Sequence, residues 1–268
     1  MTADRLRLLA GSLLAFWLVL PLVPLAIWSF ARGWRFPDLL PQVWTLDAWR
    51  QVLSEGSGVL ESLGLTTAIA LATTLLAALV GVPAGRALGL HDFRGKGLVL
   101  LLLAAPVIVP AIAIAPGLHG VFLRLGLTGT VEGVVLAHLI PVIPYMTLIM
   151  ASVFAGFDTV QEDQARSLGA SPLQVLRHVT LPAILPGLLT GALFAFLVSW
   201  SQYLLTLAIG GGRVQTLPLV LYGYASSGRN DLAGAIAIVY ILPGLAILLV
   251  TARLVTGRHP AMARGIAQ

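Results

Sequence analysis

Six long apolar runs, separated by short polar segments, set the pattern of this chain. Each run is nearly free of Asp, Glu, Lys and Arg and reaches the roughly 20 residues that a helix needs to cross a bilayer. Backbone polar groups in lipid must be satisfied within the segment, and the runs are continuous rather than alternating. They therefore predict transmembrane helices rather than barrel strands. The predicted spans cover residues 8–30, 62–88, 97–118, 131–157, 181–209 and 232–254.

Composition supports this interpretation. The chain is 58% hydrophobic and 10% charged, whereas a soluble domain carries about 25% charged residues. Six spans leave no room for a separate soluble domain, so residues 1–268 are expected to form one transmembrane domain. The first run, 8–30, is longer than the apolar core of a signal peptide, about 7–15 residues, and is interpreted as an uncleaved span. The predicted fold class is an all-α, polytopic membrane protein.

Charge gives an orientation. The net charge of +5 comes from 16 basic residues, most of them near span ends. If the N-terminus is cytoplasmic, ten basic residues fall on the inner side and six on the outer side, as the positive-inside rule requires. Both termini and the segment 158–180 then face the cytoplasm. This distribution accounts for the positive charge without a nucleic-acid partner.

The segment 158–180 is a charged stretch between two long apolar runs. Residues 158–168 have helical composition and stop at Gly169, the residue type favoured just beyond a helix C-terminus. Ser171 then suits an N-cap, with Pro172 at the first helical position. The pattern predicts a helix, a sharp turn and a second helix near the membrane surface. By spacing alone, an amphipathic connector without a partner fits as well.

The same segment resembles the "EAA" loop of the membrane-spanning subunits of bacterial ABC importers. That pattern is E-A-A, three residues, Gly, nine residues, then I-x-L-P. Asp163, Gln164 and Ala165 stand at E-A-A, Gly169 at the glycine, and Val179-x-Leu181-Pro182 closes the pattern. The segments 61–63 and 105–110 are also similar to that family. The nearest branch is the MetI-like type I permeases, with spermidine/putrescine, ferric-iron, thiamine and phosphonate importers.

The resemblance implies a function and partners. The loop would be a coupling helix that docks on a separate ATP-binding subunit, which holds ATP and Mg. A second permease subunit, identical or different, and an extracytoplasmic solute-binding protein would complete an importer in the lipid of the inner membrane. This chain itself would need no cofactor. The implied docking residues are Glu162, Asp163, Gln164, Ala165, Gly169, Ala170, Ser171 and Pro172.

Other functions are disfavoured by what the sequence lacks. It has no G-x-x-x-x-G-K-[ST] motif for ATP phosphates, so the chain is not expected to be an enzyme. Its five histidines are scattered and cysteine is absent, which predicts no metal site. No acidic residue lies in the middle of a span, which argues against proton coupling. An ion-coupled secondary transporter that uses His138 stays as the alternative, although a hydrogen-bonded packing role suits that residue better.

A polar and aromatic cluster marks a possible solute pathway in the fifth span. Ser199, Gln202 and Tyr203 are expected to share one helix face by their i, i+3 and i+4 spacing. Such a cluster either joins helices or lines a pathway, and the sequence leaves both open. The aromatic character weakly favours a polyamine-like solute. The possible pathway residues are Tyr145, Ser199, Trp200, Gln202 and Tyr203.

Overall fold

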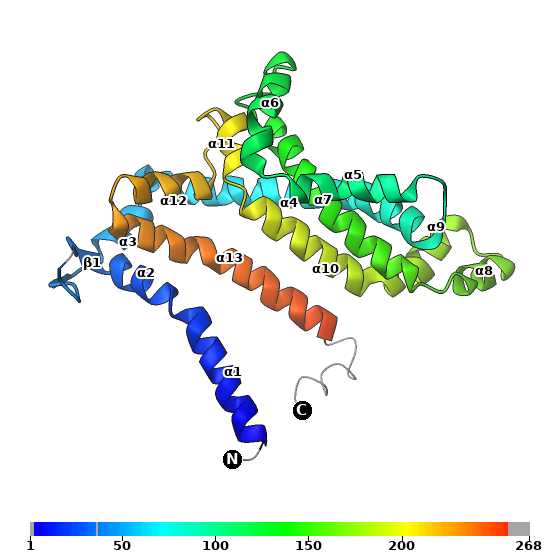
Figure 1. The fold of residues 1–268 in the computed structure, drawn as a ribbon, viewed down its shortest axis with the longest axis horizontal. Helices are drawn as coiled ribbons and strands as arrows, with labels where there is room; N and C mark the ends of the chain where they lie inside the picture. The colour runs from blue at the N-terminus through cyan, green and yellow to red at the C-terminus, as the bar shows by residue number, and fades with distance from the viewer. Residues whose placement is uncertain (1–2, 36, 257–268) are drawn as a thin grey trace. The chain divides into compact units, whose positions relative to one another are not determined.

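The computed structural model describes residues 3–35 and 37–256 of the chain. Across these residues the structure is helical apart from one antiparallel pair of two-residue strands, β1 (Ala31–Arg32) and β2 (Val43–Trp44) (Figure 1). This confirms the all-α, polytopic prediction. The helices are α1 Ala3–Val19, α2 Leu22–Ser29, α3 Asp47–Val52, η1 Glu55–Ser57, α4 Val59–Leu90, α5 Lys96–Ile108, α6 Ala111–Arg124, α7 Val131–Ala155, α8 Val160–Ser167, α9 Pro172–Val175, η2 Leu176–Thr180, α10 Leu181–Trp200, α11 Leu204–Gly210, α12 Leu217–Ser226 and α13 Asn230–Thr256.

The number of spans is only partly as predicted. Among the described residues, four continuous helices are long and apolar enough to cross a membrane, and a bent pair makes a fifth. The four are α4, α7, α13 and the continuous helix Pro172–Trp200. The predicted span 8–30 is instead two shorter helices, α1 and α2, separated at Leu20 and Pro21. The count of six spans is therefore not confirmed as such.

The predicted span 97–118 is not a straight helix. It consists of α5 and α6, which meet at an angle of 101°. Val109 between them is extended, with φ −78° and ψ 126°, and Pro110 follows. Proline has no N–H to continue the helical ladder, and its ring drives the preceding residue out of the helical region. The bend is therefore a direct consequence of Pro110.

The predicted span 181–209 is interrupted as well. α10 ends at Trp200, and α11 begins only at Leu204. The assumed shared face of Ser199, Gln202 and Tyr203 is therefore wrong, because the helix does not continue through them. No proline or glycine lies between Ala192 and Ile209, so the local sequence does not explain this interruption.

The described chain divides into two compact units. One contains the residues up to Gly64 together with Thr216–Pro243, and its core gathers Val52, Val59, Leu217 and Ile236. The other contains Leu65–Gln215 and the chain from Gly244 onward. The second unit holds the loop 158–180 and the predicted pathway residues, and the single-domain prediction stays a prediction.

A glycine stripe organises the second unit. Gly81, Gly85 and Gly89 follow one another at four-residue spacing on α4 and lie against α7. A Cβ on Gly85 would lie 2.5 Å from Met150 Cβ, and one on Gly89 would lie 2.5 Å from the Ala151 carbonyl oxygen. Only residues without a side chain allow two helix backbones to approach so closely. The stripe therefore fixes how α4 and α7 pack.

Candidate docking loop and its anchor

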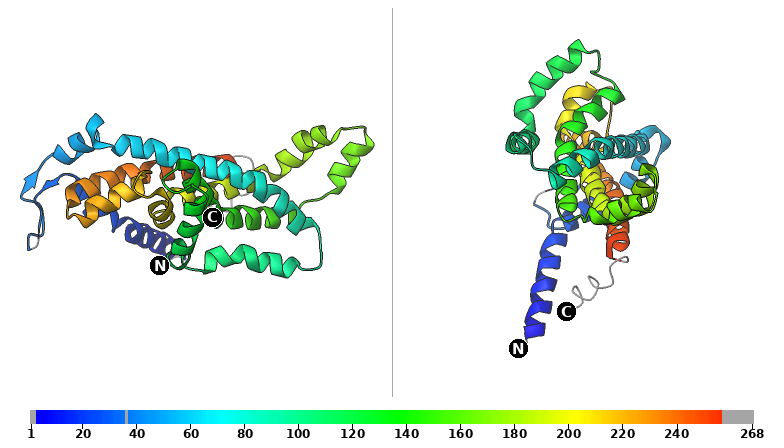
Figure 2. Two further views of the ribbon diagram at one scale, coloured as in Figure 1. Left: turned by 90° about the horizontal axis from the view of Figure 1, so that it is seen from above. Right: turned by 90° about the vertical axis from the view of Figure 1, so that its right-hand side faces the viewer.

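The loop between α7 and α10 forms the predicted helix, turn and helix. α8 ends at Ser167 with Leu168 as its C-cap, and Gly169 follows with φ +87°, in the left-handed region. The Gly169 N–H donates to the Arg166 carbonyl at 2.9 Å, and the Ala170 N–H donates to the Ala165 carbonyl at 3.0 Å. This pair of bonds is a Schellman motif, which satisfies the last carbonyls of a helix and reverses the chain. Figure 2 (left) shows the two helices meeting at this turn.

A capping box begins the second helix. The Ser171 hydroxyl accepts from the Gln174 N–H, and the Gln174 side-chain oxygen accepts from the Ser171 N–H at 2.7 Å. Pro172 occupies the first turn, where its missing N–H costs nothing. From there α9 runs through the π-helical turn η2 into α10 as one continuous helix. The second arm of the loop is thus the beginning of a membrane span.

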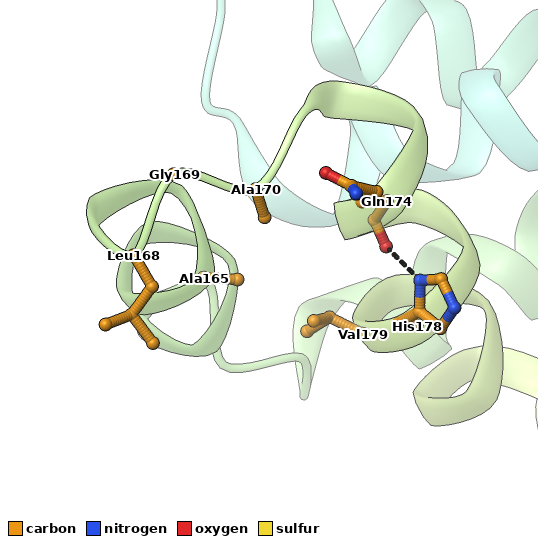
Figure 3. A pocket seen from close by; sticks show the side chains of 7 residues that line it. All are labelled: Ala165, Leu168, Gly169, Ala170, Gln174, His178 and Val179. Carbon is orange, nitrogen blue, oxygen red and sulfur yellow. Dashed lines mark hydrogen bonds between the residues drawn. The ribbon is translucent and has the colours of Figure 1, made fainter.

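The turn encloses a shallow hollow of about 310 Å³. Figure 3 shows Ala165 on the first arm facing Val179 across it, with Gln174 and His178 on the same arm as Val179. The Gln174 carbonyl oxygen lies 3.1 Å from His178 Nδ1. Small residues at 165, 169 and 170 leave this space empty. Leu168, at the rim, is 89% exposed.

Glu162 departs from its predicted role. It was expected on the docking surface, but its side chain is only 2% exposed. Its carboxylate accepts from both terminal nitrogens of Arg86, at 2.8 and 2.6 Å, and from the Thr180 hydroxyl at 2.6 Å. Arg166 adds a bond of 3.2 Å. All of these partners belong to the chain itself, so the carboxylate is not available to a partner subunit.

These bonds fix the charge state of Glu162. The Arg86 guanidinium, with smaller contributions from Thr180 and Arg166, lowers the pKa of Glu162 from 4.5 to about 2, although burial opposes the shift. A carboxylate held by charged and hydrogen-bonding donors remains ionised at neutral pH.

Arg86, Glu162 and Thr180 are together called the anchor below, and they join helical elements that are far apart in the sequence. Arg86 belongs to α4, Glu162 to α8 and Thr180 to η2, just before α10. The guanidinium also lies over the ring of Phe154 in α7, 5.4 Å from its centre. Arg86, Thr180 and Phe154 were not singled out from the sequence, because nothing local marks a pair separated by 76 positions. The glycine stripe that flanks Arg86 could have been found from the sequence, because glycines spaced by four residues predict close packing of two helices.

The other predicted docking residues lie on the surface of the loop. The Asp163 side chain is 68% exposed and forms an ion pair with Arg166 of its own helix, at 2.8 Å. Ala165 and Ala170 are half-buried beside the turn. The remaining four are exposed: Gln164, Gly169, Ser171 and Pro172. Their part in docking stays a prediction, but their placement is compatible with it.

The predicted pathway residues are less accessible. Ser199 and Trp200 are buried, and Trp200 stacks on Phe196 with ring centres 5.5 Å apart. Gln202, Tyr203 and Tyr145 are half-buried. Ser199 bonds His138, which is itself buried, as a packing residue would be. A pathway role for these five residues stays a prediction.

Residues 81–264 match the family described as "Binding-protein-dependent transport system inner membrane component". The chain belongs to this family. The membership confirms the resemblance inferred from the loop and makes the chain a multi-pass permease subunit of the inner membrane. Within the described residues, no group of three or more His, Asp or Glu side chains is placed to hold a metal ion.

Relatives in this family are permease subunits with different named solutes. The chain is 29% identical over 211 residues to the spermidine/putrescine transport system permease protein PotC of Haemophilus influenzae, covering 79% of this chain and 82% of that protein. PotC of Escherichia coli is 26% identical over 246 residues, 91% and 92% of the two chains. The trehalose transport system permease protein SugB of Mycobacterium tuberculosis is 27% identical over 236 residues, 85% of each.

Solved structures share the fold. One is a bacterial ABC transporter involved in the import of the acidic polysaccharide alginate, with a TM-score of 0.60, 19% identity and coverage of 94% of this chain and 98% of that chain. Another is the inward-facing MetNI methionine ABC transporter, with a TM-score of 0.60, 18% identity and coverage of 76% and 99%. The permease fold thus extends over nearly the whole chain.

Proposed function

We propose that this chain is the translocation subunit of an ABC importer and that the loop 158–180 is its docking site for a separate ATPase subunit. The observation that carries the proposal is the construction of the loop. A Schellman turn and a capping box hold its two arms, and a buried carboxylate anchors it, while Asp163, Gln164 and Gly169 remain exposed. A connector without a partner has no need of such rigidity.

The anchor can transmit a displacement of α8 to the membrane spans. A partner that displaces α8 pulls on Glu162 and hence on Arg86 of α4 through two short charged bonds. The same displacement reaches α10 directly, because the second arm of the loop continues into it. ATP and Mg would be bound and used on the partner, and this chain would convert the closure of the ATPases into rearrangement of its spans.

The remaining parts of the proposal follow from the family. The loop and both termini face the cytoplasm, a second permease subunit completes the pore, and a solute-binding protein docks on the outer side. A related solved structure is described as a bacterial alginate ABC transporter in complex with an alginate pentasaccharide-bound periplasmic protein, which supports this kind of assembly. The alternative of an ion-coupled secondary transporter is not favoured by membership of a binding-protein-dependent family.

For the solute, we propose a polyamine. Support comes from the spermidine/putrescine names of the PotC relatives and from the aromatic residues among the predicted pathway positions, which attract cations through their ring faces. Uptake of labelled spermidine into proteoliposomes holding the complete transporter tests this proposal, with labelled trehalose as the comparison. Uptake of trehalose but not spermidine would overturn the polyamine assignment and leave the importer role intact.

The docking role is tested by co-purification. The tagged chain is isolated in mild detergent, and its associated subunits and ATP hydrolysis are measured. Gly169→Asp places a side chain and a charge at a left-handed turn, and is expected to release the ATPase. Gly126→Asp is the matched control, because Gly126 also has positive φ and open space but lies outside the loop. Equal ATPase retention by both variants, or recovery of the chain alone, would contradict the proposal.

A further inference from the structure

The interruption between α10 and α11 needs a cause outside its own sequence. Helix breaks are usually attributable to proline, glycine, a π-bulge or an inserted side chain. The stretch from Ala192 to Ile209 contains neither proline nor glycine. The Ser201 N–H still donates to the Leu197 carbonyl, whereas the Gln202 N–H turns to Ser199, so something packed against the interruption must divert the ladder from Gln202 onward.

His138 of α7 occupies that position. It is 1% exposed, and its two ring nitrogens contact hydroxyls on opposite sides of the interruption. Nδ1 lies 2.9 Å from the Ser199 hydroxyl in the last turn of α10, and Nε2 lies 2.9 Å from the Thr206 hydroxyl in α11. One imidazole thus connects the end of one helix to the body of the next.

The direction of these bonds can be assigned. The Thr206 hydroxyl donates its single proton to the Gln202 carbonyl oxygen at 3.0 Å, so it must accept from His138 Nε2–H. In a neutral imidazole the other nitrogen is an acceptor, so Nδ1 accepts from the Ser199 hydroxyl. Both partners are hydroxyls and the ring is buried, which suits the neutral form. The three hydrogen bonds form one chain, called the relay below. It runs from Ser199 through His138 and Thr206 to the Gln202 carbonyl in the interruption.

Other contacts hold α11 as an element separate from α10. The carbonyls near the C-terminus of a helix lack partners within it. In α11, the Ala208 carbonyl lies 2.6 Å from Nδ1 of His119 in α6, and the Ile209 carbonyl accepts from the Gly129 N–H at 2.7 Å. The position of α11 is thus fixed by its neighbours α6 and α7, and not by continuity with α10.

We propose that His138 is a positioning residue that keeps the fifth span interrupted. Through its relay it presents Ser201–Tyr203 as non-helical backbone beside the predicted pathway. Interrupted helices place helix ends at transport sites in membrane proteins. The positioning stands on the geometry above, whereas its use in transport rests on the proposed function.

Hydrogen–deuterium exchange of the whole chain, in nanodiscs with its co-purifying subunits, tests the relay. Thr206→Val keeps the side-chain shape but removes the hydroxyl that both accepts from His138 and donates to Gln202. Loss of these two buried hydrogen bonds should accelerate amide exchange over 202–210 at least about tenfold, which corresponds to about 1.4 kcal/mol. Thr206→Ser, which keeps the hydroxyl, should exchange at the wild-type rate. Exchange over the α4 residues 65–90 should not change in either variant.

The inference is overturned if Thr206→Val exchanges over 202–210 like the wild type, or if Thr206→Ser accelerates as much as Thr206→Val. The second result would show that packing, not the hydroxyl, holds α11. ATPase retention in the co-purification assay is expected to be normal in both variants. Failure of the docking proposal and failure of the relay are therefore seen in separate measurements.

Discussion

Glu162 and Arg86 form a two-point ion pair across 76 positions of sequence, with N–O distances of 2.8 and 2.6 Å. The carboxylate is buried, whereas the guanidinium side chain is 34% exposed. A paired guanidinium and carboxylate with two parallel bonds fixes orientation as well as distance. The loop that is proposed to bind the ATPase is therefore held at a defined angle to α4.

Replacing Glu162 with Gln should destabilise the chain markedly. Breaking a buried ion pair costs about 3–5 kcal/mol, and here the partial exposure of Arg86 reduces the expected loss to about 2–3 kcal/mol. Asp163→Asn is the control, since exposed ion pairs are worth at most about 1 kcal/mol. Thermal unfolding in detergent measures both. Equal unfolding midpoints for the two variants would show that the anchor contributes no stability.

The anchor should also be sensitive to acid. Because the folded-state pKa of Glu162 is about 2, below its ordinary 4.5, the carboxylate stabilises the fold above pH 4.5. That contribution is lost as the pH falls from 4.5 toward 2. The difference in unfolding midpoint between wild type and Glu162→Gln should be constant at neutral pH and should shrink over this acidic range. A difference that grows on acidification would contradict the assigned pKa shift.

The turn at Gly169 should tolerate few side chains. A Cβ there meets nothing within 4 Å, so the cost of Gly169→Ala is that of the left-handed backbone alone, about 1–2 kcal/mol. Gly169→Asn should cost less, because asparagine enters this region more readily. Gly97→Ala, at an open helical site in α5, should be neutral or stabilising. ATPase retention should follow the order Gly, Asn, Ala at position 169, and no dependence on the residue would refute the structural role of the turn.

The glycine stripe makes a prediction about packing. Gly85→Ala would force its Cβ within 2.5 Å of Met150 Cβ, and overpacking of this kind costs about 1–3 kcal/mol. Gly64→Ala, on the same helix but with nothing within 4 Å, should be stabilising by about 0.5–1 kcal/mol. Thermal unfolding of the two variants provides the comparison. The close approach of α4 to α7 is wrong if both variants are equally stable.

Local signals explain which parts of the fold were predictable. Gly169, Ser171 and Pro172 act through their own backbone preferences, so the helix, turn and helix followed from a ten-residue window. Apolar runs likewise marked α4, α7 and α13 within a few residues of their ends. In each case the deciding interaction lies within the segment itself.

Tertiary contacts explain what was missed. The interruption at Ser201–Tyr203 involves His138, some sixty positions earlier, and a purely local reading extends the helix through it. Glu162 was expected on the docking surface because of the resemblance to the EAA loop, and no local signal pairs it with Arg86, 76 positions away. The bend at Pro110 has a local cause that the sequence carries, because proline interrupts a helix, but its size depends on how α6 packs against α11.

The glycine stripe and the anchor occupy the same stretch of α4, where Arg86 directly follows Gly85. Two helices in backbone contact have no layer of side chains between them that can deform to absorb a displacement. A pull on Arg86 therefore turns α4 and α7 together, as one rigid lever, instead of sliding one along the other. Under the proposed docking role, the bend at Pro110 and the interruption at Ser201–Tyr203 are the places where the helices of this unit can change direction without breaking a continuous ladder.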